Sequence, residues 1–262
     1  RQMCIRDRYY LYQELSKKFD IEMLALSYLD IPRREIYPHV WETCVARTPE
    51  WRRIEEQLNK TVGTASGDIV FLEHMETVPA FVELAQKLSK DADAVLMEHP
   101  YCYPLMKLLN KPFILSSHNV EWLLKKAMYT ENAETARLIT LLRDTEKEAY
   151  HNALVTVFCC ETDANTFQTD FGNAQHFVVN NGYETQSIRF VPQSERVQLR
   201  LTAGYDKPIV LFMGSWHKPN IESVEYILRI APQLPEWQFI VVGSVGDYFK
   251  DCQLPHNVMP VS

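Results

Sequence analysis

The chain has 262 residues, 46% of them apolar, and this length predicts two domains with substantial hydrophobic cores. A formal net charge of -7 with no basic stripe argues against a nucleic-acid partner. No run approaches the roughly 20 apolar residues of a membrane span, and no signal-peptide pattern is recognised, so we expect a cytoplasmic protein. The six cysteines show no CxxC pair and no framework spacing, which predicts reduced thiols.

Both ends of the chain are expected to be cut. Residues 1–8 resemble the translation of a sequencing-library adapter, and they are therefore excluded from the fold prediction. At the other end, residues 257–262 stop in the middle of a strand-and-helix pattern, with no terminal helix or polar tail. We therefore expect the chain to lack pieces of its fold on both sides.

The first third of the chain mixes helix and strand signals. The predicted elements are a helix at 9–18, a strand at 21–26, a helix from 48 to about 60 and a helix from about 76 to 90. Thr48, Pro49 and Glu50 form a helix start, with a capping hydroxyl, a proline in the first turn and an acid near the helix dipole. Residues 30–47 are expected to be irregular, because Pro32 and a second proline interrupt them.

A regular alternation of strands and helices follows. Strands are predicted at 94–97, 113–117, 154–158 and 177–179, and helices at 103–109, 120–129, 133–150 and 163–171. Such an alternation implies a doubly wound parallel sheet. The polar segment 183–207 then predicts a linker between an N-terminal domain, residues 9–182, and a C-terminal domain, residues 208–262.

The C-terminal domain opens on five consecutive apolar residues, Ile209 to Met213, which predict a strand buried on both faces. Gly214 ends this strand, and Asn220 is predicted to cap the helix that follows. A second strand, 237–242, and a second glycine turn at Gly243 come next. Two parallel strands place both turns on one edge of a sheet, where the N–H groups of a helix N-terminus can hold an anion.

Two polar motifs follow strands of the N-terminal sheet. His118, in the sequence Ser-His-Asn-Val-Glu, follows the strand at 113–117 and either faces a ligand at the sheet edge or caps the next helix. Glu98 and His99 follow the preceding strand, and either they join the same ligand site or they form a strand-end turn fixed by Pro100. Spacing alone leaves both pairs of alternatives open.

The ordered set of motifs resembles a family 4 (group 1) glycosyltransferase of the GT-B fold. The matching stretches are Tyr10–Leu15, Ala92–Tyr101, His118–Glu121, Glu146–Asp163, Val178–Gly182, Leu211–Asn220, Phe239–Gly243 and Pro255–Val258. The resemblance covers nearly the whole chain from Tyr9 and implies an α/β fold of two Rossmann-like, doubly wound parallel-sheet domains, both incomplete. The family's first strand with its glycine-rich turn, and its paired donor-site glutamates, are expected outside the chain.

The resemblance implies that a sugar moves from a nucleotide-diphosphate-sugar to an acceptor hydroxyl with retention of configuration. It implies a catalytic role for His118, and an acceptor side of the cleft formed by Glu98, His99, Asn119 and Glu121. No metal and no other cofactor is implied. The implied partners are the nucleotide-sugar donor and a saccharide, lipid-linked or small-molecule acceptor, and peripheral membrane contact of the full-length protein stays open.

The same resemblance implies a donor side around the two glycine turns. Its residues are Gly214, Ser215, Trp216, Lys218, Asn220 and Gly243. Ser215 and Asn220 stand where many members have Arg and Lys, so the helix N-terminus and Lys218 are expected to hold the diphosphate. The chain as it stands is expected to be inactive alone. Two alternatives are kept: a nucleotide-sugar epimerase, and a non-catalytic nucleotide-sugar-binding GT-B protein.

Overall fold

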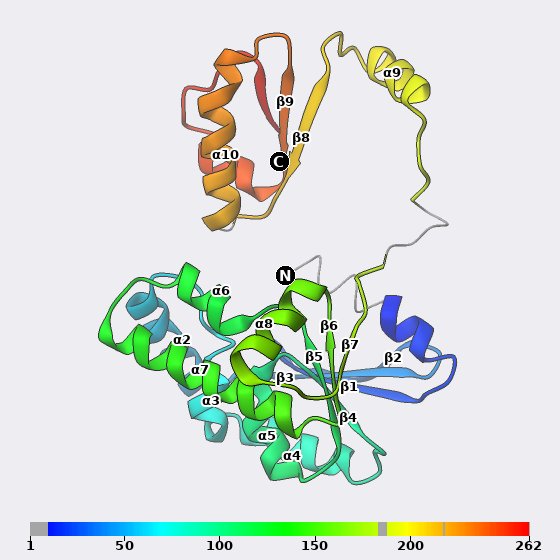
Figure 1. The fold of residues 1–262 in the computed structure, drawn as a ribbon, viewed down its shortest axis with the longest axis vertical. Helices are drawn as coiled ribbons and strands as arrows, with labels where there is room; N and C mark the ends of the chain where they lie inside the picture. Colours follow the sequence, from blue (N-terminus) through cyan, green and yellow to red (C-terminus); the bar gives the residue numbers. More distant parts are fainter. Residues whose placement is uncertain (1–9, 183–187, 217, 262) are drawn as a thin grey trace. The chain divides into compact units, whose positions relative to one another are not determined.

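The computed structural model describes residues 10–182, 188–216 and 218–261, which fold into two compact units. The first unit extends to residue 184, and the second begins at residue 185 (Figure 1). The adapter-like residues 1–8, His217 in the first glycine turn and part of the expected linker lie outside the described residues. The linker segment contains helix α9 (Gln193–Thr202), and from residue 185 onward it clusters with the second unit.

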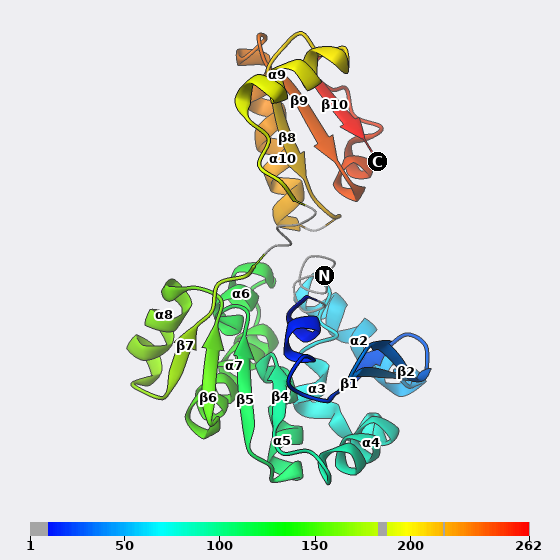
Figure 2. The ribbon, with the colours of Figure 1, turned by 90° about the vertical axis from the view of Figure 1, so that its right-hand side faces the viewer.

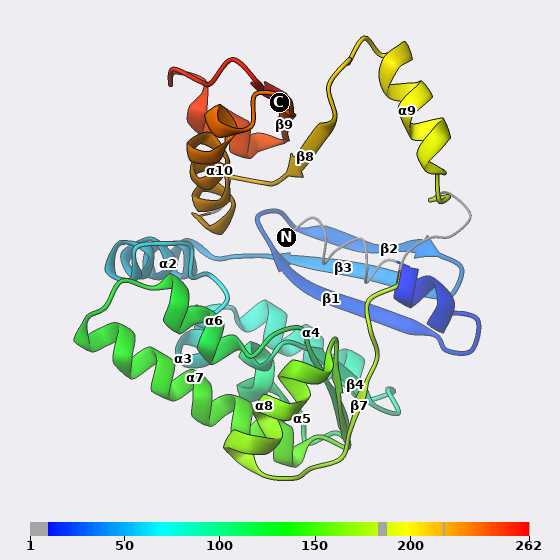
Figure 3. The ribbon, with the colours of Figure 1, turned by 45° about the horizontal axis from the view of Figure 1, so that its top comes forward.

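The first unit begins with helical residues 10–15 and a three-stranded sheet. Its strands β1 (Ile21–Ser27), β2 (Ile31–Tyr37) and β3 (Val40–Ala46) lie in the order β1-β3-β2, with β1 parallel and β2 antiparallel to β3 (Figure 3). The irregular segment expected at residues 30–47 is therefore not found. Pro32 was compatible with a strand because β2 lies at the sheet edge, where its register shifts between Ile31 and Arg34.

Three helices follow this sheet. They are α2 (Pro49–Val62), α3 (Val70–His74) and α4 (Pro79–Ser89), with the 3₁₀ turn η1 (Met75–Thr77) between the last two. Helix α2 starts as predicted, because the Thr48 hydroxyl accepts the Trp51 N–H at 3.1 Å, and it ends at Gly63 with φ 79°. Helix α4 begins at Pro79, later than the sequence indicates, and α3 is not predicted by the sequence.

The second sheet of this unit is wholly parallel. Its strands β4 (Val95–Glu98), β5 (Phe113–Ser117), β6 (Val155–Phe158) and β7 (His176–Val178) lie side by side in chain order (Figure 2). The connecting helices are η2 (Pro100–Cys102), α5 (Tyr103–Leu109), α6 (Glu121–Met128), α7 (Ala133–Asn152) and α8 (Glu161–Phe171). The predicted strand–helix alternation is confirmed, and it brings the ends of β4 and β5 to one edge.

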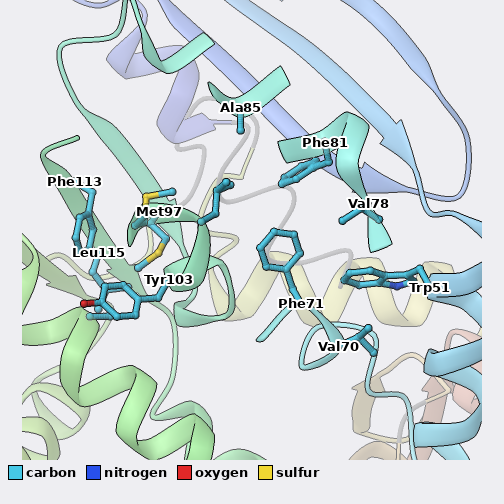
Figure 4. Close-up of a cluster of buried hydrophobic side chains, with 13 residues drawn as sticks. Trp51, Val70, Phe71, Val78, Phe81, Ala85, Met97, Tyr103, Phe113 and Leu115 are labelled. Carbon is cyan, nitrogen blue, oxygen red and sulfur yellow. The ribbon is translucent and has the colours of Figure 1, made fainter. Parts of the chain in front are cut away.

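One hydrophobic core connects the two sheets of the first unit. Trp51, Phe71 and Phe81 form successive ring contacts, with centroids 6.0 Å and 5.6 Å apart (Figure 4). Met97 of β4 and Leu115 of β5 belong to the same cluster, and apolar residues of β1 and β3 pack against it. Burying a large apolar side chain stabilises the fold by roughly 1.5–3 kcal/mol. This core therefore fixes the positions of β4 and β5, and with them the polar residues at the ends of these strands.

The second unit has a parallel three-stranded sheet in the order β10-β9-β8. After α9 its elements are β8 (Ile209–Met213), α10 (Lys218–Ile230), η3 (Ala231–Gln233), β9 (Gln238–Val242), η4 (Ser244–Phe249) and β10 (Val258–Val261). Strand β10 adds to the two strands that the sequence predicts. Strand β8 is not buried on both faces: Val210 and Phe212 pack into the core with Val224, whereas Leu211 and Met213 are 57% and 70% exposed.

Thiols and membrane-spanning segments can be judged for the described ranges only. There, the cysteines at positions 44, 102, 160 and 252 are free thiols. None of the helices in those ranges combines the length and the apolar character needed to cross a membrane.

Candidate functional site

The ends of β4 and β5 bring the two polar motifs of the first unit together. Glu98 pairs with Ser116 in the parallel register, and the N–H of His99 still bonds to the Ser116 carbonyl oxygen at 3.2 Å. His118 directly follows Ser117, the last residue of β5. Glu98, His99 and His118 therefore share one sheet edge, as the parallel order predicts.

His118 is bonded to a carboxylate. Its Nε2 lies 2.7 Å from Oε2 of Glu98, and only 8% of its side chain is exposed. The other oxygen of Glu98 accepts a hydrogen bond from the Tyr12 hydroxyl at 2.5 Å. Sequence reasoning missed Tyr12, because the pattern around it indicates only a helix. A carboxylate on one ring nitrogen fixes the orientation of the imidazole.

His99 forms a second imidazole–carboxylate pair beside the first. Its Nδ1 lies 3.0 Å from Oε1 of Glu121, and its ring stacks on that of His118 with centroids 4.2 Å apart and planes at 23°. Glu121 also accepts hydrogen bonds from the Tyr101 hydroxyl at 2.6 Å and from Nδ2 of Asn119 at 3.3 Å. All four residues predicted for the acceptor side thus lie in one cluster with His118.

Glu121 is buried but has compensating partners. Burial alone would raise its pKa, yet hydrogen bonds from His99 and Tyr101 and the charge of Lys125 outweigh burial, and the pKa of Glu121 is lowered. Lys125, one turn along α6, bonds to Asp68 at 2.5 Å. Burial, reinforced by nearby carboxylates, raises the pKa of Tyr101 well above its ordinary value, so its hydroxyl stays a donor. The i,i+4 spacing of Glu121 and Lys125 is the one sequence signal for these residues around Glu121.

The N-terminus of α6 is capped by a buried carboxyl group and not by His118. Glu146 of α7, 1% exposed, accepts the backbone N–H groups of Glu121 and Trp122, each at 2.9 Å. The helix-capping interpretation of His118 is therefore wrong, since these N–H groups already have an acceptor. Burial raises the pKa of Glu146 to about 8 against these two hydrogen bonds, and the charges of Glu121 and Asp163 raise it further.

In the second unit, the glycine turns after β8 and β9 touch each other. Gly243 has φ 98°, and a Cβ built on it would lie 2.5 Å from the Gly214 carbonyl oxygen, so only glycine fits this close approach. The Trp216 N–H bonds across to the Ser244 hydroxyl oxygen at 2.8 Å. The structure thus joins three of the predicted donor residues in one double turn.

The start of α10 differs from the prediction. The helix begins at Lys218, so Asn220 lies inside its first turn and does not cap it. Nδ2 of Asn220 instead donates to the carbonyl oxygen of Ser215 at 3.0 Å, which ties the helix back to the turn. Local sequence could not separate these two roles, because an asparagine near a helix start serves either. Lys218 is exposed at the helix start.

A shallow cavity of about 400 Å³ adjoins the double turn. It is lined by Trp216, Ser244, Asp247 and Tyr248, and the Trp216 and Tyr248 ring centroids are 6.5 Å apart. Asp247 and Tyr248 belong to η4 and were not candidates on sequence grounds, since a 3₁₀ turn has no clear periodic signal. Across the residues that can be described, His, Cys, Asp and Glu side chains form no group of three or more suited to a metal ion.

No protein-family model and no curated protein sequence matches the chain. Solved structures that resemble it include sucrose-phosphate synthase from Thermosynechococcus elongatus, with a TM-score of 0.70, 16% identity and coverage of 97% of this chain. Anabaena HepE in complex with UDP-glucose resembles it with a TM-score of 0.55, 13% identity and coverage of 91% of this chain. The UDP-forming α,α-trehalose-phosphate synthase from Burkholderia vietnamiensis has a TM-score of 0.51, 9% identity and coverage of 96% of this chain.

The match covers these three proteins incompletely. The chain spans 64% of the sucrose-phosphate synthase, less than two thirds of its length, and 68% and 69% of the other two. At these identities the likeness concerns the fold and not the substrate. All three are GT-B glycosyltransferases, and the chain has the α/β, Rossmann-like GT-B fold that its sequence predicts.

Proposed function

We propose that the protein is a retaining glycosyltransferase of the family 4 type, which moves a sugar from a nucleotide diphosphate to an acceptor hydroxyl. One observation carries the proposal: a GT-B fold that places polar groups at the ligand-binding edge of its parallel sheets. In the first unit these groups are the His118–Glu98 pair, and in the second the Gly214 and Gly243 turns. Since one fold serves many functions, the proposal depends on these groups.

The double turn of the second unit suits a donor diphosphate. The first backbone N–H groups of an α-helix have no partner within the helix, and its dipole favours an anion there. Lys218 adds an exposed cation at the start of α10. As the sugar–phosphate bond breaks, charge grows on the leaving diphosphate, and fixed donors of this kind stabilise it; removing one typically costs ~10²–10³ in rate.

The first unit supplies the group that contacts the reacting sugar. Glu98 holds the imidazole of His118 in one orientation, so a hydrogen bond between this ring and the sugar needs little reorganisation. The acceptor side is formed by Glu98, His99, Asn119 and Glu121. The His99 ring stacks on that of His118, and Glu121 accepts hydrogen bonds from His99 and Asn119. The proposal involves no metal and no cofactor beyond the nucleotide sugar, and it places the enzyme in the cytoplasm.

The first donor to test is chosen from the ligands named for the structurally similar proteins. HepE is described in complex with UDP-glucose, and the trehalose-phosphate synthase is described as UDP-forming. A uridine-diphosphate sugar is therefore the first donor to offer this protein. The acceptor classes that remain are saccharides, lipid-linked molecules and small molecules.

Transfer is tested by incubating the full-length protein with UDP-glucose and a panel of acceptors, and by identifying the products by mass spectrometry. A new glycoside together with UDP supports the proposal. An isomerised nucleotide sugar supports an epimerase, and binding of UDP-glucose without any product supports a binding protein. His118→Ala should abolish transfer with the fold intact, whereas His74→Ala, at an exposed histidine outside the cluster, should not.

A further inference from the structure

His99 adopts a backbone conformation that suits glycine. Its φ is 68° and its ψ is 153°, a region in which the Cβ of an L-residue is strained. Among the described residues, His39 and Asn110 are the other non-glycine residues with positive φ, at 67° and 49°. Asn110 ends helix α5, where asparagine commonly takes a left-handed conformation, and His39 lies in the turn between β2 and β3.

The surrounding fold imposes this conformation on position 99. The N–H of His99 makes the last hydrogen bond of the β4–β5 ladder, to the Ser116 carbonyl oxygen. The next residue, Pro100, already begins η2, and both Pro100 and Tyr101 are buried. The chain must therefore turn from strand to helix within one residue. This explains the backbone angles but not the histidine, because glycine would adopt them without strain.

The imidazole of His99 is fixed on one side and open on the other. Its Nδ1 is held by Glu121, and its ring rests on His118. One third of its side chain is exposed, at 33%, and Nε2 has no hydrogen-bond partner among the described residues. Because the Glu121 carboxylate only accepts, the proton of the neutral ring lies on Nδ1, and Nε2 is left with a lone pair.

We propose that His99 is a ligand-contacting residue, whose Nε2 accepts a hydrogen bond from a hydroxyl group of the sugar at the β4–β5 edge. The inference rests on the proposed function in taking this ligand to be a saccharide. A hydroxyl can donate to the open nitrogen, whereas an anion would be repelled by the carboxylates of Glu98 and Glu121. Residues with strained backbone angles cluster at active sites and ligand-binding sites.

Four variants separate the strain of position 99 from the function of its ring. His99→Ala and His99→Gly both lack the imidazole, but only alanine keeps the strained Cβ, so His99→Gly should have a Tm a few degrees above that of His99→Ala. His39→Ala and His39→Gly are the matched pair at a positive-φ histidine outside the cluster, and they should show the same order of Tm. Both variants at position 99 should raise KM for the sugar at least about tenfold, and both at position 39 should leave it unchanged.

A second readout observes the contact directly. In wild-type protein, the ¹⁵N resonance of His99 Nε2 should shift on titration with glucose or with UDP-glucose. Variants at position 99 that bind sugar as wild type does would overturn the inference, as would an Nε2 resonance that stays in place at saturating sugar. A wild type that binds neither probe would overturn it as well.

The outcomes for the inference and for the proposed function can be told apart. Transfer that survives in both variants at position 99 overturns the role of His99 and leaves the glycosyltransferase standing. A wild type whose His99 resonance responds to glucose, but which transfers no sugar to any acceptor, supports the sugar contact of His99 and overturns the glycosyltransferase proposal.

Discussion

The ring of His99 lies on the ring of His118, with centroids 4.2 Å apart and planes only 23° from parallel. The two residues come from different motifs, one after β4 and one after β5, and each ring is held by its own carboxylate. A change at either carboxylate is therefore expected to reach both rings. This coupling makes the carboxylates, and not only the histidines, worth testing.

Glu98→Gln should lower kcat/KM for transfer while leaving the fold intact. The amide keeps the shape of the side chain but loses the charge that accepts from His118 and Tyr12. Hydrogen bonds to charged groups contribute about 1.5–3 kcal/mol, which corresponds to a loss of roughly 10–100-fold. Steady-state kinetics with UDP-glucose measures it. Glu22→Gln, which breaks an exposed pair with Arg33, is the control and should be silent.

Glu146 should make the stability of the protein depend on pH. Burial raises the folded-state pKa to about 8 from an ordinary 4.5. Between these values the folded state holds a proton that the unfolded state has released. The contribution of Glu146 to stability should therefore be greatest below about pH 4.5 and fall as pH rises to about 8, by up to ~1.4 kcal/mol per pH unit.

Glu146→Gln removes this titration. Urea unfolding of both proteins from about pH 5 to about pH 8 should show the wild type losing stability relative to the variant. A difference between the two proteins that stays constant across the range would contradict the raised pKa.

Gly243→Ala should destabilise the second unit and weaken donor binding. The added Cβ would lie 2.5 Å from the Gly214 carbonyl oxygen, at a φ of 98°. Gly204→Ala is the matched control, because Gly204 also has a positive φ, 84°, but nothing lies within 4 Å of the added Cβ. Strain alone costs about 1–3 kcal/mol, so Gly204→Ala should lose that much and Gly243→Ala more. Equal losses in urea unfolding would mean that the turn can move apart.

Asn257 should be essential to the stability of the second unit. It is 1% exposed, and its Nδ2 donates to the carbonyl oxygens of Ala231, Leu234 and Trp237 at 2.8–3.1 Å. Asn257→Ala leaves these buried acceptors without a donor and should cost about 2–4 kcal/mol. Asn257→Asp fills the same volume but cannot donate, so it should be no better. Unfolding measurements in which the aspartate variant matches wild type would show that the hydrogen bonds are dispensable.

The fold could be predicted where local pattern and tertiary burial agree. Strand β5 and helix α5 have the bounds that the sequence indicates, because a short apolar run and a proline-started helix are each complete within their own residues. Strand β2 was hidden by Pro32, which only its edge position makes acceptable, and β10 by Pro260. Whether a strand lies at an edge is a tertiary property that its own sequence does not carry.

In the candidate site, too, some residues could be placed from the sequence and others could not. Parallel order alone places Glu98, His99 and His118 on one edge. Tyr12 reaches Glu98 across 86 residues of chain, and Glu146 reaches the start of α6 across 25. No periodicity or spacing marks contacts of that kind, so the groups that orient the histidines become visible only in three dimensions.

Strand β2 also bears on how the protein behaves at high concentration. Its outer edge pairs with no other strand of the described residues and could recruit one from another molecule, yet Pro32 has no N–H to offer. The next two residues, Arg33 and Arg34, are folded back over the sheet in ion pairs with Glu22 and Glu42. An incoming strand would meet a missing donor and a row of charge, so edge-to-edge aggregation should not begin here.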